Sequence, residues 1–329
     1  MEKVEKLIAD VISQIEDWKG EDLTYERWPD FFMWNCNWAV SVNGKKYFVK
    51  IPGEKSELFF NRDHIHEASV IAADSGVGPA VPYYLKDSGV EISEWLENYS
   101  GLKTDKWIFQ HRFEEKFLFK SIDLLKKLHN SGKELSNKKN IFDQIRDLSA
   151  IIDKNKTFEI RERPYLENLV DRIEKAIIAN GGMDLKPCIN NICERWSWDF
   201  MWNESEQDLK IVDYEWASMN DVCSDLATLS TSAMLYDDHD KELVEHYFGE
   251  LNEFQFARFK LFKILVLIKA CFFMAILDKF RPAEFDYIRS YGWKMARLRN
   301  LLHDPRTENW IWSVKNQKGF DNWKGYPIA

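Results

Sequence analysis

The chain has 329 residues, a composition that is ordinary for a globular protein, and a formal net charge of −9. The negative charge excludes nucleic-acid binding as the main function, because that binding needs a basic surface. The length favours two lobes over a single core. The most apolar stretch, Leu261–Leu277, contains Lys263 and Lys269, so we expect a buried helix there and no membrane insertion.

The N-terminal segment begins with an amphipathic pattern and continues into a predicted β-hairpin. Apolar residues at helical spacing indicate a helix over Glu2–Trp18. Two alternating runs, Trp38–Val42 and Lys46–Ile51, flank Asn43-Gly44, a dipeptide that favours the positive φ angles of a type I′ turn. Because side chains alternate across a strand, Lys50 should share a face with Phe48, opposite Tyr47, Val49 and Ile51.

A helix and a second pair of strands follow the hairpin. Arg62–Ser75 has the pattern of a helix that ends at Gly76. Val81–Leu85 and Val90–Trp95 have the pattern of strands, and a short turn separates them. The start of the chain is therefore rich in strands.

The remainder of the chain is mostly helical. From residue 116 onward apolar residues recur with the helical period, apart from one short apolar run that ends in an acid, Leu209–Asp213. Strands at the start and helices afterwards predict an α+β fold in two lobes. We expect residues 1–95 to form the N-terminal lobe and residues 96–329 the larger, mainly helical one.

The cysteines indicate the compartment. There are five of them, an odd number, scattered along the chain: Cys36, Cys188, Cys193, Cys223 and Cys271. With no secretory signal at the N-terminus, this pattern predicts a reduced, cytoplasmic protein. Cys188 and Cys193 have no second pair of ligands at zinc spacing, so we expect no zinc site there.

An ordered series of short segments resembles a known family. The segments are Asn35–Trp38, Tyr47–Gly53, Asn61-Arg62, Gly76–Pro79, Ile92–Leu96, Leu125–His129, Ile211–Asp221, Asp225–Ala227, Tyr247–Glu250 and Phe285–Tyr287. Together they resemble the choline/ethanolamine kinase and aminoglycoside phosphotransferase family, and bacterial choline kinases most of all. The resemblance implies a bilobal, protein-kinase-like fold. It also implies phosphorylation, with ATP and Mg²⁺, of a hydroxyl on a small amino alcohol or an aminoglycoside-like acceptor.

Phosphoryl transfer needs a cation on the phosphates and carboxylates for the metal, and the resemblance supplies residues for both. It implies that five residues bind the nucleotide: Asn35, Asn37, Lys50, Glu94 and Leu96. It implies that Asp199 and Asp213 hold the metal. The alternatives are a surface lysine with an extended stem for Lys50 and a helix-capping aspartate for Asp213.

Two segments depart from the family pattern. Phe31–Trp34 stand where relatives carry a glycine-bearing turn, and bulky side chains hinder a close approach of the backbone to phosphates. The helix acid that pairs with the strand lysine in relatives should fall at Ile65. Glu67 lies two residues further, about 200° around the helix, so it should face away from Lys50.

The catalytic loop also departs from the pattern, and two registers remain open. One anchors on Pro187-Cys188 and puts Asn191 at the position of the base, with an insertion before Asp199. The other has no gap and puts Glu194 there. The first register leaves no proton acceptor, which costs roughly 10²–10⁴-fold in rate, whereas the second keeps a carboxylate.

The acceptor pocket is the least determined part. Relatives hold a quaternary ammonium between aromatic faces and acids. The aromatic candidates are Trp216, Tyr291, Trp293, Trp310 and Trp312, and the acidic candidates are Glu215 and Asp225. For each tryptophan, packing in the core is the alternative.

Three functions therefore compete: a small-molecule kinase, a pseudokinase that binds a ligand without efficient transfer, and an enzyme of other chemistry on the same fold. The departures at the glycine turn, the helix and the loop motivate the second. The sequence leaves the oligomeric state and the identity of the acceptor open.

Overall fold

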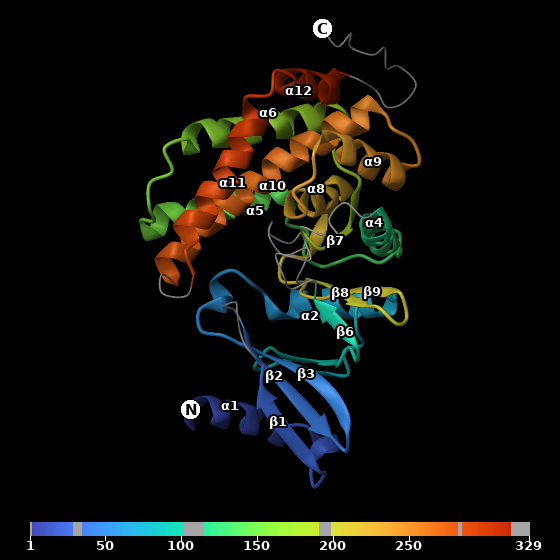
Figure 1. The fold of residues 1–329 in the computed structure, drawn as a ribbon. Coiled ribbons are helices and arrows are strands. Elements are labelled where there is room, and N and C mark those ends of the chain that lie inside the picture. The colour runs from blue at the N-terminus through green and yellow to red at the C-terminus, as the bar shows by residue number, and fades with distance from the viewer. Residues whose placement is uncertain (1, 29–34, 102–114, 191–198, 282–284, 317–329) are drawn as a thin grey trace.

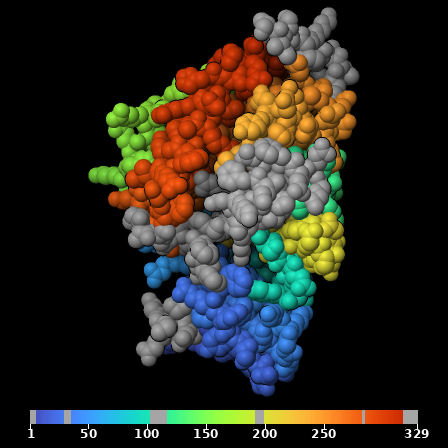
Figure 2. Space-filling model, in the orientation of Figure 1, coloured from blue at the N-terminus to red at the C-terminus, as the bar shows by residue number. Residues whose placement is uncertain are grey.

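The computed structural model describes residues 2–28, 35–101, 115–190, 199–281 and 285–316. An antiparallel sheet forms one end of the molecule and a group of helices the other (Figure 1). In the space-filling view the N-terminal residues lie at one end, and α11 and α12 cover much of the surface at the other (Figure 2). The predicted α+β, bilobal architecture is confirmed, whereas the boundary at residue 95 remains a prediction.

The strands are β1 Leu23–Arg27, β2 Asn35–Val42, β3 Lys45–Pro52, β4 Tyr83–Leu85, β5 Val90–Glu94, β6 Tyr99–Gly101, β7 Leu185–Cys188, β8 Phe200–Asn203, β9 Asp208–Ile211 and β10 Ser218–Asp221. The α-helices are α1 Glu2–Ser13, α2 Arg62–Asp74, α4 Glu115–His129, α5 Ile141–Asn155, α6 Arg163–Ala179, α8 Val222–Ser232, α9 Asp237–Phe248, α10 Glu253–Phe280, α11 Tyr287–Leu302 and α12 Thr307–Asn316. Short 3₁₀ turns cover Glu16–Trp18 and Ser56–Leu58.

The N-terminal sheet has five strands in the order β1-β2-β3-β5-β4, and neighbouring strands are antiparallel. Its central hairpin joins β2 to β3 as predicted, and Asn43 and Gly44 both have positive φ, at 51° and 81°. Strand β3 buries Tyr47, Val49 and Ile51. The alternation therefore leaves Lys50 on the other face.

An apolar core covers one face of this sheet. It consists of Ile8, Val11, Ile15, Trp18, Trp38, Val40, Val42, Tyr47, Val49, Ile51, Val90 and Ile92. The first helix ends at Ser13 rather than at Trp18, and a 3₁₀ turn then brings Trp18 onto the sheet. The predicted helix is thus confirmed over its first twelve residues.

Helix α2 joins the two parts of the fold. Its N-cap is Asn61, whose side chain accepts hydrogen bonds from the first turn, and it ends before Gly76, which has a φ of 67°. The apolar side of α2, which includes Ile65 and Ala68, belongs to the core of the helical part. In Figure 1 the helix lies between the sheet and the β8–β9 hairpin.

The helical part is built around α10. Every residue from Phe256 to Leu277 is buried, and α5, α8, α11 and α12 pack around the helix. The prediction of a buried helix over Leu261–Leu277 is therefore confirmed. Within the ranges that the structure describes, no helix combines the length and the apolar character of a membrane span.

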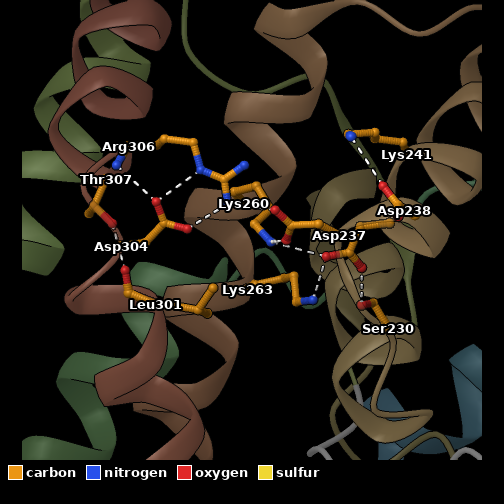
Figure 3. Close-up of polar contacts among 11 residues, drawn as sticks. Ser230, Asp237, Asp238, Lys241, Lys260, Lys263, Leu301, Asp304, Arg306 and Thr307 are labelled. Atoms are coloured by element: carbon orange, nitrogen blue, oxygen red, sulfur yellow. Dashed lines mark hydrogen bonds and ion pairs between the residues drawn. The ribbon is translucent and has the colours of Figure 1, made fainter. Parts of the chain in front are cut away.

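Ion pairs of buried side chains connect α10 to its neighbours (Figure 3). The Asp240 carboxylate on α9 is completely buried and accepts hydrogen bonds from Lys260 (3.1 Å) and Lys263 (2.7 Å) of α10. Lys260 also contacts Asp237 at 2.6 Å, and Asp237 pairs with Arg306 beside α12. Such charges are tolerated inside a protein because each has an opposite charge within hydrogen-bonding distance.

Candidate functional site

Lys50 and Asp213 meet between the two parts of the fold. The Lys50 Nζ on β3 donates a hydrogen bond to the Asp213 Oδ1 at 2.8 Å, although the residues are 163 positions apart. The Glu215 Oε1 lies 3.7 Å from the same ammonium group. The convergence expected for Lys50 and Asp213 is thus present.

Asp213 lies in a turn and not at the end of a strand. Strand β9 stops at Ile211, and Asp213 has a φ of 75°, a left-handed conformation that is costly for a residue with a side chain. The Tyr214 hydroxyl donates to the Ile211 carbonyl at 2.7 Å and closes this turn. The apolar run Leu209–Asp213 thus forms a strand only as far as Ile211, and the turn that follows brings Glu215 to Lys50.

The turn packs closely on the end of α2. A β-carbon on Gly78 would lie 2.5 Å from the Tyr214 hydroxyl and 3.2 Å from the Ile211 carbonyl oxygen. Only glycine leaves room for this approach. The segment that carries Asp213 is therefore fixed against the segment that follows α2.

Asp199 lies at the same end of the β8–β9 hairpin as Asp213. It directly precedes β8 and is buried, and its carbonyl accepts a hydrogen bond from the Val212 amide at 2.8 Å. Burial, together with the charges of Glu91, Asp199 and Asp213, raises the pKa of Tyr214. Two carboxylates at one hairpin end form a set of hard oxygen donors, which suits Mg²⁺.

Asn35 and Arg62 extend the polar cluster towards β2 and α2. The Asn35 side-chain amide donates to the Glu215 Oε1 at 2.9 Å. The Arg62 guanidinium donates to the Asn35 Oδ1 at 2.7 Å. A continuous chain of contacts therefore runs from α2 through β2 to the partners of Lys50.

The electrostatics of the cluster favour the charged form of Lys50. Burial alone would lower the pKa of Lys50, but the carboxylates of Asp213, Glu215 and Glu91 outweigh it and raise that pKa above its ordinary value. Burial lowers the pKa of Arg62 despite the same acids. Lys50 is therefore a permanent cation at neutral pH.

The helix acid of related kinases has no counterpart in α2. Ile65, the position that the resemblance aligns with that acid, is 6% exposed and packs in the core. Glu67 faces away from Lys50 and accepts hydrogen bonds from the Ser136 amide (2.7 Å) and hydroxyl (2.6 Å). Among the described residues of α2, no carboxylate forms an ion pair with Lys50.

Glu91 was not anticipated from the sequence. It stands opposite Lys50 in the β3–β5 register and accepts from the Ser69 hydroxyl at 2.9 Å, while His66 lies 3.2 Å from its other oxygen. The available signal in the sequence was an acid between two apolar residues of the predicted strand, Val90 and Ile92. Glu91 fastens α2 to the sheet on the side where Lys50 emerges.

The other nucleotide candidates lie along the same sheet. Asn37 is paired with Lys50 in the β2–β3 register. Glu94, at the end of β5, forms an exposed ion pair with Lys45 at 2.7 Å, and Leu96 follows that strand. The loop candidates Asn191 and Glu194 lie outside the described residues.

Trp216 is partly buried and packs against other side chains of the protein. Its ring makes edge contacts with Phe60 and Phe273, at centroid distances of 5.3 Å and 5.1 Å. The Lys269 ammonium lies 4.3 Å from the centroid of the ring and donates to the Asn190 carbonyl at 2.6 Å. These contacts favour the packing alternative for Trp216, and the sequence had given Lys269 no role there.

Asp225 supports the segment before the catalytic loop. One oxygen accepts from the Ile189 amide at 2.9 Å and lies 3.0 Å from the His129 ring, and the other accepts from the Asn190 amide at 2.7 Å. The carboxylate is buried. These contacts favour a role in holding the backbone at residues 189–190 over the expected contact with an acceptor.

Trp293 lies on the outer face of α11. It is 59% exposed and lines a shallow hollow of about 700 Å³ together with Arg289 and Arg297. Two guanidinium groups would repel a cationic ligand. Of the other aromatic candidates, Trp310 is buried and Trp312 is half exposed.

Comparisons with known proteins agree with this architecture. No family model matches the chain. Two LicA proteins of Haemophilus influenzae are each 24% identical, over 231 and 237 residues, and in each case the match covers 70% of this chain. The chain spans 64% of the length of one and 82% of the other.

Solved structures match over nearly the whole chain. A choline/ethanolamine kinase family protein from Mesorhizobium loti has a TM-score of 0.77 at 19% identity, covering 95% of this chain and 99% of that one. Choline kinase LicA from Streptococcus pneumoniae has a TM-score of 0.71 at 21% identity, covering 91% and 99%. A spectinomycin phosphotransferase has a TM-score of 0.52 at 14% identity, covering 93% and 97%. At these identities the likeness establishes the fold, and it confirms the resemblance expected from the sequence.

Proposed function

We propose that the chain is a choline kinase-like phosphotransferase, which uses ATP and Mg²⁺ to phosphorylate a hydroxyl on a small amino alcohol of the choline or ethanolamine type. The observation that carries the proposal is the 2.8 Å contact between the Lys50 ammonium and the Asp213 carboxylate, which come from opposite parts of the fold. The names of the relatives support the acceptor class.

Each group in the cluster has a role in this reaction. Magnesium ATP, when bound, supplies the phosphoryl group. Lys50 binds the phosphates, and Asp199 and Asp213 hold the metal through their oxygens. Structures of LicA with AMP and of the spectinomycin phosphotransferase with ADP support nucleotide binding at a fold of this kind.

The register of the catalytic loop decides whether a loop residue accepts the proton of the acceptor hydroxyl. In the register without a gap Glu194 accepts it, and in the other register Asn191 can only position the hydroxyl. Glu194→Gln should therefore abolish transfer if the register without a gap holds. Unchanged turnover in that variant, in an assay that detects wild-type transfer, would point to the register with Asn191 or to no base at all.

The pseudokinase alternative rests on the three departures from the family pattern, of which the described residues include one, the helix with Ile65 in place of the acid. A thermal-shift measurement with ATP and MgCl₂ tests binding, and transfer of labelled phosphate to choline, ethanolamine and spectinomycin tests chemistry. We expect a shift with the wild type, none with Lys50→Met, and transfer to an amino alcohol. A shift without transfer to any acceptor would favour the pseudokinase. The absence of a shift would contradict the proposal that the chain binds a nucleotide. The cytoplasmic location remains a prediction from the cysteine pattern.

A further inference from the structure

The two carboxylates beside Lys50 are not equivalent. Asp213 is the nearer, at 2.8 Å, but its side chain is 17% exposed and it lies in a turn at the end of a hairpin. Glu215, at 3.7 Å, is only 7% exposed. The Asn35 amide also holds the oxygen that faces Lys50, at 2.9 Å. Glu215 is therefore the more deeply buried of the two, and Asn35 holds the oxygen that faces Lys50.

Asn35 is itself held from α2. Its carbonyl oxygen accepts from Arg62 at 2.7 Å, so its amide group must point towards Glu215. The stem of Arg62 packs on Gly89, where an added β-carbon would lie 2.7 Å from the Arg62 Cγ and where φ is 68°. The guanidinium is thus fixed by the turn between β4 and β5 as well as by its hydrogen bond.

In the proposed reaction Asp213 has two tasks that compete. A carboxylate that binds Mg²⁺ gives up much of its attraction for a neighbouring ammonium group. Lys50 would then lose its nearest partner at the moment when it has to meet the phosphates. In related kinases a helix acid keeps the lysine in place at that stage, but here that position is Ile65, which is buried in the core.

We propose that Glu215 takes the place of the missing helix acid and positions Lys50 for the nucleotide phosphates, and that Arg62 acts through Asn35 to position Glu215. This inference rests on the proposed function. It makes Glu215 a positioning residue rather than a contact for the acceptor. Helix α2 then orients Lys50 through the chain Arg62–Asn35–Glu215 instead of through a direct ion pair.

Nucleotide binding by isothermal titration calorimetry tests the proposal. Glu215→Gln keeps the shape of the side chain but removes its charge, so it should weaken ATP binding at least tenfold, also in the presence of MgCl₂. Adenosine binding should not change, because adenosine has no phosphates for Lys50 to meet. Arg62→Met should weaken ATP binding in the same direction but less. The matched control is Glu67→Gln on the other side of α2, which should bind both ligands as the wild type does.

A double-mutant cycle in urea unfolding tests the pairing without any nucleotide. Lys50→Met and Glu215→Gln should each change the free energy of unfolding, and the double variant should differ from the sum of the two. Additive effects would overturn the pairing. Wild-type affinity for ATP in Glu215→Gln, or an equal loss of adenosine binding, would overturn the positioning role. If the wild type binds no ATP, the proposed function fails, whereas the cycle still decides whether Glu215 holds Lys50.

Discussion

Removing the charge of Asp240 tests how much of the stability of the helical part depends on one buried carboxylate. Its Oδ1 accepts from the Ser230 hydroxyl, and its Oδ2 accepts from Lys260 at 3.1 Å and from Lys263 at 2.7 Å. The side chain has no exposed surface. The substitution Asp240→Asn keeps the shape and one acceptor oxygen, but leaves two ammonium groups without their shared anion.

The expected loss of stability in Asp240→Asn follows from these contacts. Breaking a buried ion pair by removing one partner costs about 3–5 kcal/mol. Lys260 keeps Asp237 at 2.6 Å. The pKa of Lys263 is lowered to about 8, because burial and the nearby Lys260 outweigh the attraction of Asp240, so Lys263 can release its proton in the variant. Both effects place the expected loss near 3 kcal/mol, the lower end of the range.

Urea unfolding followed by circular dichroism at pH 7 measures the loss, and the same helix offers a matched control. Asp238 forms an ion pair with Lys241 at 3.2 Å, but its side chain is 89% exposed (Figure 3). An exposed pair contributes about 0–1 kcal/mol, so Asp238→Asn should leave the free energy of unfolding nearly unchanged. A loss below about 1 kcal/mol in Asp240→Asn, or equal losses in both variants, would refute the reasoning.

Three further predictions concern buried positions. Lys263→Met should alter the pH dependence of stability. In the folded wild type the pKa of Lys263 is about 8, which lies below its value in the unfolded chain. Between roughly pH 8 and 10 the unfolded wild type therefore binds more protons than the folded wild type. The wild type should then gain stability relative to the variant as the pH rises, by up to about 1.4 kcal/mol per unit in urea titrations, and a constant difference would contradict this. Ile65→Glu puts an acid at the position of the helix acid but inside the core, so its midpoint of thermal unfolding should fall sharply without tighter ATP binding; tighter binding would count against the packing argument. Asp225→Asn leaves two backbone amides and His129 with a weaker acceptor. It should lower the free energy of unfolding by about 1–3 kcal/mol and speed hydrogen exchange at residues 189–190. Unchanged exchange at these residues would argue against the role of Asp225 in holding this backbone.

Local chemistry made much of the N-terminal sheet predictable. Asn43-Gly44 specifies the turn through its own backbone preferences, and the period of two then fixes which side chains share a face. The position of Lys50 on the face opposite the core follows from these two features alone. Ile65 could likewise be aligned with the helix acid because both ends of α2 carry local signals, the cap Asn61 and Gly76.

The surroundings of the acids could not be predicted in the same way. Asp225 and Glu215 are both acids near an apolar run, and the sequence does not distinguish one that caps buried backbone amides from one that faces an ammonium group. The difference depends on contacts made with residues far away in the chain. The left-handed turn at Asp213 is another case, because its conformation depends on Tyr214 and on the space beside Gly78.

The position of Ile65 has a consequence for the coupling of the two parts. In related kinases the helix acid holds the strand lysine from within the N-terminal part of the fold. Here α2 uses this position to pack into the core of the helical part, and the two carboxylates that form ion pairs with Lys50, Asp213 and Glu215, come from the turn after β9. The orientation of Lys50 therefore depends on close contact between the sheet and the β8–β9 hairpin. Any change that separates them would disturb Lys50 even if every residue of the sheet kept its place.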